Sequence, residues 1–155
     1  MENIIFTLFD IFNFGLVVFF WWFTLKHYKN LPKRIPVHFD FDGKADSFGN
    51  KAFSFFTPLL GTFFYFLFTY TLRHPETANF PVEITNQNKD VQFLIMETFL
   101  RWLFALIMLI FMNGQDYTFR YAFDENVKPK VPLPTAILLV IGSLIIALIF
   151  VGIFK

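Results

Sequence analysis

One short run of polar residues has the residue types that bind metal ions. His38, Asp40 and Asp42 alternate with apolar residues, and this period of two is typical of a short strand. Such a strand directs the imidazole and both carboxylates to one face, where they can hold a divalent cation. The Asp-x-Asp spacing resembles a calcium loop, but Gly43 comes too early and Lys51 stands where the bidentate glutamate should be. A solvated polar face is the alternative, and we predict no metal site.

Four further polar residues fall inside long apolar segments. Asp10 and Asn13 lie in the first segment, and Glu97 and Arg101 lie in the third at the i, i+4 spacing of a helix pair. An ionisable residue inside a membrane span suggests a functional site. If both segments enter the bilayer from the same side, Asp10 and Arg101 share a depth, so we predict that they pair, with Glu97 in support. The alternatives are a structural contact or a wet position for Asp10, and a surface pair for Glu97 and Arg101.

The sequence lacks the arrangements of common enzyme sites. It has no Ser-His-Asp order, zinc-helix motif or phosphate loop. It has no Cys, which excludes disulfides, thiolate metal sites and thiol nucleophiles. A net charge of +1 gives no basic surface for nucleic acid. We therefore predict a protein that is not an enzyme, needs no cofactor and binds no nucleic acid.

The elements that position these polar groups are predicted to be membrane helices. The 155 residues are 55% hydrophobic and 16% charged, whereas soluble domains are about 25% charged. The charges are bunched between apolar runs close to the ~20 residues that a lipid core requires. We predict an all-α, four-transmembrane-helix bundle in the cell membrane, one domain over residues 1–155 with a structured first loop. The predicted spans are 4–25, 53–72, 91–112 and 135–154.

The third span is the least regular. Glu97 and Arg101 interrupt it, and its charge-free part, 102–112, covers about half a bilayer. A reentrant or interfacial segment is the alternative. Polar residues from Asn113 onward predict a loop that continues to Pro132, where the last span is introduced.

Two predicted spans have faces suited to helix packing. Small residues let helices approach closely in lipid, where no hydrophobic force draws them together. In the last span such a stripe contains Ala136, Ser143 and Ala147. In the second span, we expect small and hydroxyl residues to face the bundle and large apolar residues to face lipid. The two sets are Ser54, Thr57, Pro58, Gly61, Thr62, Tyr65 and Thr69, and Phe55, Phe56, Leu59, Leu60, Phe63, Phe64 and Leu67.

Lysine and arginine predict the orientation in the membrane. The first and third loops contain most of these residues, whereas the opposite side has Arg73, Lys89 and Lys155. By the positive-inside rule, the first and third loops are cytoplasmic and both termini lie outside.

The loop between the first two spans has the most distinctive sequence. Pro32 and Pro36 impose an extended path, and Asp42-Gly43 is a turn dipeptide. Asp46, Ser47 or Asn50 provides a cap for the second span. We expect binding to concentrate in this loop, and the candidate binding residues are Pro32, Pro36, His38, Gly43, Asp46, Gly49 and Lys51.

This loop resembles the signature of the domain of unknown function 1648 family, in which Leu-Pro, Ile-Pro and a His-aromatic pair precede spaced Gly, Asp, Gly and Lys. The resemblance covers the loop and both flanking helices, and it implies a small bacterial polytopic membrane protein. One branch includes the immunity protein against the sporulation-delaying toxin, which also sequesters a repressor at the membrane. That branch has extra helices that this chain lacks. The matching positions are Leu31, Pro32, Ile35, Pro36, His38, Phe39, Gly43, Asp46, Gly49 and Lys51.

These features lead to two hypotheses of function. The first is an immunity or signalling component that recognises a partner protein or toxin through the first loop. The second is a small transporter or channel, a homo-oligomer that uses Asp10 and the polar face of the second span. A transporter needs a continuous polar path, whereas a recognition protein needs only a shaped loop and a sealed core. In a purely structural loop, Asp46 caps the second helix and Lys51 anchors at the headgroups.

Overall fold

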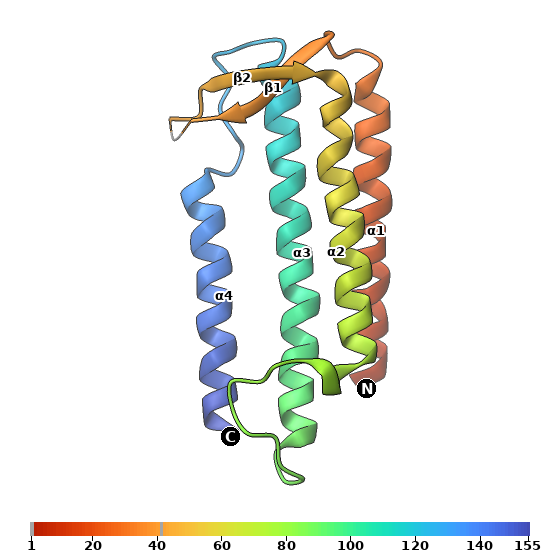
Figure 1. The fold of residues 1–155 in the computed structure, drawn as a ribbon, viewed down its shortest axis with the longest axis vertical. Coiled ribbons are helices and arrows are strands. Elements are labelled where there is room, and N and C mark those ends of the chain that lie inside the picture. The colour runs from red at the N-terminus through yellow and green to blue at the C-terminus, as the bar shows by residue number, and fades with distance from the viewer. Residues whose placement is uncertain (1, 41) are drawn as a thin grey trace.

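The computed structural model describes residues 2–40 and 42–155, so Phe41 of the predicted strand lies outside the described residues. In the described part, four long helices lie side by side and a two-stranded sheet crosses one end of the bundle (Figure 1). The elements in chain order are α1 (Glu2–Tyr28), β1 (Arg34–Phe39), β2 (Ala45–Asn50), the short 3-10 helix η1 (Lys51–Phe55), α2 (Phe56–Arg73), the 3-10 helix η2 (Pro75–Thr77), α3 (Lys89–Tyr121) and α4 (Leu133–Ile153).

Each of the four long helices is long and apolar enough to cross a membrane, with η1 extending the second one. They alternate in direction, so both termini and the second loop lie at one end of the bundle (Figure 1). The sheet and the third loop lie at the other end. The prediction of an all-α bundle with four spans is confirmed, and the chain is a multi-pass membrane protein.

The third span differs from the prediction at its C-terminal end. Helix α3 continues to Tyr121, so the predicted loop from Asn113 and the reentrant alternative are wrong. Gln115 explains the difference, because its polar side chain is buried and satisfied by neighbouring helices. Its Nε2 donates to the hydroxyl of Thr24 in α1, and its Oε1 accepts from the hydroxyl of Thr57 in α2. A polar residue with partners on two sides does not end a membrane helix.

Helix α3 is central and packs against the other three helices. The apolar core lies between α1 and α3 and contains Val17, Phe20, Phe104 and Met108, all buried. Helix α4 packs chiefly on α3. There Ala136 of the predicted stripe is buried, and Ser143 accepts a hydrogen bond from Trp102.

The two predicted faces of α2 are largely present. Gly61 is buried against α3, and Phe56 faces outward with 60% of its surface exposed. Two members of the predicted lipid-facing set are exceptions. Phe55 stacks on Trp21 of α1, and Phe64 packs against the apolar core.

Candidate functional site

The first loop forms a β-hairpin that closes one end of the bundle. β1 and β2 pair antiparallel from Arg34 with Asn50 to Phe39 with Ala45, and the register shifts around His38. Gly43 sits in the turn with a φ of 79°, which glycine adopts without strain. The expected turn is therefore present. The second strand was not predicted.

Two tyrosines of α3 hold the tip of the hairpin. The ring of Phe39 packs against the rings of Tyr117 and Tyr121, with centroids 4.8 and 5.3 Å apart. The hydroxyl of Tyr117 donates to the carbonyl of Gly43, and the amide of Ala45 donates to the hydroxyl of Tyr121 at 3.2 Å. The last turns of α3 thus position the hairpin. Sequence reasoning missed both tyrosines because they fell in the predicted third loop; their i, i+4 spacing, typical of one helix face, was the available signal.

Lys51 holds the base of the hairpin rather than facing solvent. Its Nζ donates to the carbonyl of Tyr28 at 3.2 Å and lies 4.5 Å from the centre of the Tyr28 ring. A cation at the C-terminal end of α1 also meets the negative end of the helix dipole. Leu31 and Ile35 are buried beside it, against Phe119 of α3. These signature positions therefore have structural contacts.

Several other signature residues also shape the loop. Pro36 is fully buried. A Cβ on Gly49 would come within 2.8 Å of Cγ1 of Val37. Asn50 caps η1, because its Oδ1 accepts from the amide of Ala52 at 2.9 Å, so Asn50 rather than Asp46 is the cap.

The outer face of the hairpin presents a histidine–carboxylate pair. Nδ1 of His38 lies 2.6 Å from Oδ1 of Asp46, and their side chains are 68% and 49% exposed. Asp40 is engaged in the turn, where its Oδ1 accepts from the amide of Lys44. No three His, Cys, Asp or Glu side chains gather as metal ligands in the part of the chain that the structure describes. Phe48, two residues after Asp46 on β2, has 42% of its surface exposed.

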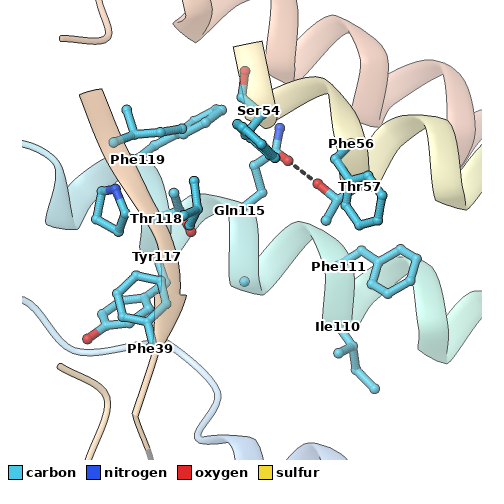
Figure 2. A pocket seen from close by; sticks show the side chains of 15 residues that line it. Phe39, Ser54, Phe56, Thr57, Ile110, Phe111, Gln115, Tyr117, Thr118 and Phe119 are labelled. Carbon is cyan, nitrogen blue, oxygen red and sulfur yellow. Dashed lines mark hydrogen bonds between the residues drawn. The ribbon is translucent and has the colours of Figure 1, made fainter. Parts of the chain in front are cut away.

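A pocket of about 350 Å³ lies beneath the hairpin, between β1, the start of α2 and the end of α3. Figure 2 shows the hydrogen bond from Thr57 to Gln115 at one wall, with the Phe39 and Tyr117 rings at the other end. Ser54 also lines the pocket; it is buried, and its hydroxyl has no hydrogen-bond partner among the described residues. The remaining walls are mainly apolar, formed by Ile35, Pro36, Val37, Phe53, Phe56, Ile110, Phe111 and Phe119.

The second group of predicted residues meets near the other end of the bundle. Arg101 is 9% exposed at its side chain; its Nε donates to Asp10 at 2.8 Å and its Nη1 to Glu97 at 3.3 Å. The amide of Asn13 donates to the backbone carbonyl of Arg101 at 3.1 Å. The pairing predicted from a shared depth is therefore present. The group binds α1 to α3, and Asp10 and Asn13 lie in the first half of α1, whereas the hairpin follows the other end of that helix.

The apolar core separates the two polar layers of the bundle. On the hairpin side lie Thr24 and Gln115, which bond to each other. On the other side lie Asp10 and Arg101. Between them Phe20 and Met108 are fully buried and Phe104 nearly so. Between α1 and α3, apolar side chains therefore separate the two polar groups in the described part of the chain.

One family model matches part of the chain. Residues 15–62 match the family model described as "Domain of unknown function (DUF1648)". The match starts within α1, includes the whole hairpin and ends within α2, so it is shorter than the loop with both complete helices. Eight of the fifteen residues that line the pocket fall in the matched segment. No curated protein and no solved structure matches the chain.

Proposed function

We propose that this membrane protein, whose residues 15–62 match the family model of a domain of unknown function (DUF1648), recognises a partner protein at its hairpin end. It acts as an immunity or signalling component, with a toxin as one class of partner, and it is not an enzyme. The observation that supports this most is the rigid hairpin with free outer side chains. His38, Asp46 and Phe48 are exposed there, whereas Ile35 and Pro36 are buried and Tyr117 and Tyr121 hold the tip.

The residues of the first-loop signature divide into buried or bonded positions and exposed ones, and this division supports recognition of a partner protein. Lys51, Ile35 and Pro36 are occupied by structural contacts. Such residues preserve the shape of the hairpin and leave the contact with a partner to the exposed ones. The exposed ring of Phe48 matches the composition of protein interfaces, in which aromatic residues are enriched.

The sealed core does not favour the transporter hypothesis. A transporter that works within one chain requires a polar path, and Phe20, Phe104 and Met108 fill that position. An oligomeric pore would have to run between chains, along faces that are strongly apolar here, such as that of α4.

The test substitutes the exposed residues of the hairpin and, separately, a residue that holds the hairpin to the bundle. His38→Gln combined with Asp46→Asn removes the pair while keeping side-chain size, so expression and melting temperature should stay unchanged. A photoreactive amino acid at position 48 should crosslink a partner in intact cells, and the double substitution should abolish that crosslink. The same photoreactive group at position 79, in the second loop, serves as the matched control.

The outcome for Lys51 separates recognition from stability. Lys51→Met should lower the melting temperature, and its effect on crosslinking should follow the amount of folded protein. If the His38 and Asp46 substitutions also reduce crosslinking only in proportion to the amount of folded protein, the hairpin is a scaffold and recognition at this face is refuted.

A further inference from the structure

A second cavity, of about 280 Å³, lies between α2, α3 and α4 where the second loop meets the bundle. The loop crosses from α2 towards α4 at this end (Figure 1), and the ring of Phe80 in the loop stacks on that of Phe93 in α3 with centroids 5.4 Å apart. The lining is apolar apart from Thr71, Asn79 and Gln92, and none of the lining residues is charged. A mainly apolar lining with a few polar groups is typical of ligand pockets.

Gln92 is the fully buried polar residue of this cavity, with 0% of its surface exposed. Its Nε2 donates to the carbonyls of Val151 and Phe154 at the end of α4, at 3.2 and 2.9 Å. These bonds fix the amide, because the reversed amide would place its oxygen against two carbonyl oxygens. Oε1 is thus held as an acceptor, and it has no hydrogen-bond partner among the residues that the structure describes. A buried acceptor without a donor is costly, so a ligand that donates to it gains affinity.

The rest of the lining restricts the chemistry of such a ligand. The hydroxyl of Thr71 donates to the carbonyl of Leu67 at 3.1 Å, and Asn79 is exposed in the second loop. Because the lining has no charged residue, a phosphate, carboxylate or ammonium group would lose its hydration there without meeting an opposite charge. The cavity therefore favours a neutral, largely apolar ligand with a hydroxyl group.

The apolar lining extends from Gln92 towards the middle of the bundle. Met96 and Leu100 follow Gln92 at i+4 and i+8, so the three residues share one face of α3. The helix rises about 12 Å from Gln92 to Leu100. Helix α3 begins at the end where the second loop lies and runs towards the hairpin (Figure 1). A ligand bonded to Gln92 would thus have its polar end outermost and its hydrocarbon part deeper, which is the orientation of a lipid in a bilayer.

The α4 side of the cavity borders the lipid phase. Helix α4 packs chiefly on α3. Leu144 and Leu148 of α4 line the cavity, and they are 45% and 48% exposed. Both lie in a membrane span, where exposed surface contacts hydrocarbon. The surrounding bilayer is therefore the source of the ligand.

We propose that this cavity binds a neutral lipid of the bilayer that has a free hydroxyl group, such as a monoacylglycerol or diacylglycerol. The hydroxyl donates to Oε1 of Gln92, and one hydrocarbon chain lies against Met96 and Leu100. The site is at the opposite end of the bundle from the hairpin (Figure 1), and it is independent of partner recognition there.

The experiment uses the full-length protein in phosphatidylcholine nanodiscs and a fatty alcohol with a diazirine in its chain. Light should attach this probe saturably to residues that line the cavity, which peptide mass spectrometry locates. Dodecanol should displace the probe about fivefold more effectively than dodecyl methyl ether at equal content in the bilayer, because the ether has no hydrogen to donate. Gln92→Met retains the length of the side chain without the amide and should remove this preference.

Two substitutions on α4 test the location of the site. Ala147→Phe places a ring in the cavity and should abolish the labelling. Gly142→Phe is the matched control and should be labelled normally, because a Cβ at that position has nothing within 4 Å.

Three results would overturn the proposal. The first is equal displacement of the probe by dodecanol and its methyl ether. The second is a preference for dodecanol that Gln92→Met retains. The third is labelling of the cavity that a folded Ala147→Phe variant leaves unchanged. If Ala147→Phe does not fold, the comparison of the two competitors on the wild-type protein decides the question.

Discussion

Replacing the charges that join α1 to α3 tests their contribution to stability. Asp10→Asn leaves Arg101 bonded to Glu97 at 3.3 Å, so the free energy of unfolding should fall by about 1.5 kcal/mol, the low end for a hydrogen bond to a charged group, because the Asp10 side chain is 50% exposed. Arg101→Gln removes the cation that contacts both carboxylates, and because its side chain is only 9% exposed, the loss should be about 3–5 kcal/mol.

The double variant should be milder than the sum of the two single changes. Once Arg101 is absent, Asp10→Asn relieves a carboxylate that has lost its partner, which gives a coupling of about 1–3 kcal/mol. Unfolding in mixed micelles, followed by tryptophan fluorescence, measures the stability of the wild type, both single variants and the double variant, which together form a double-mutant cycle. Asp116 pairs with Arg120 at the hairpin end, so Asp10→Asn combined with Asp116→Asn should be additive and is the control. Additivity in the Asp10–Arg101 cycle would refute the pairing.

Three further predictions concern the hairpin base, the helix packing and the orientation. Lys51→Met should lower the free energy of unfolding by about 2 kcal/mol through the lost bonds to the carbonyls of Tyr28, at the end of α1, and of Leu31; a denaturation curve equal to wild type would contradict this contact. Gly61→Val should destabilise by about 1–3 kcal/mol, because even a Cβ there lies 2.8 Å from a buried sulfur, while Gly142→Val, with open space, should be neutral in the same assay. A cysteine at Asn79 should react with an impermeant thiol reagent in intact cells and one at Lys128 should not; the reverse pattern would invert the orientation.

The four spans were predictable because membrane helices follow from length and composition. Each apolar run had to satisfy its own backbone hydrogen bonds, and only a helix does so in lipid. The end of α3 was not predictable in this way. Gln115 is polar in sequence and is satisfied only after folding, by Thr24 and Thr57 on two other helices. A single sequence does not reveal such long-range partners.

Only part of the hairpin was predictable, because its second strand also depends on partners that are distant in the sequence. Gly43 indicated its turn correctly, but β2 has little strand propensity, with Asp46, Gly49 and Asn50 among its six residues. It forms because β1 and the hydroxyl of Tyr121 provide partners for its backbone. The sequence identified the residues of the site but not the contact that each one makes. Lys51, for example, reads as a surface lysine until its contact with Tyr28 is known.

The dependence of α4 on a single neighbour has a consequence for the order in which the protein forms. Among the described residues, the pocket lining ends at Phe119, the side chains of α3 that bond the hairpin tip are those of Tyr117 and Tyr121, and α4 packs chiefly on α3. During translation, the hairpin end can therefore assemble as soon as α3 has left the ribosome. The fourth helix then joins a body that is already formed, guided by Gln92, whose amide donates to the carbonyls of Val151 and Phe154.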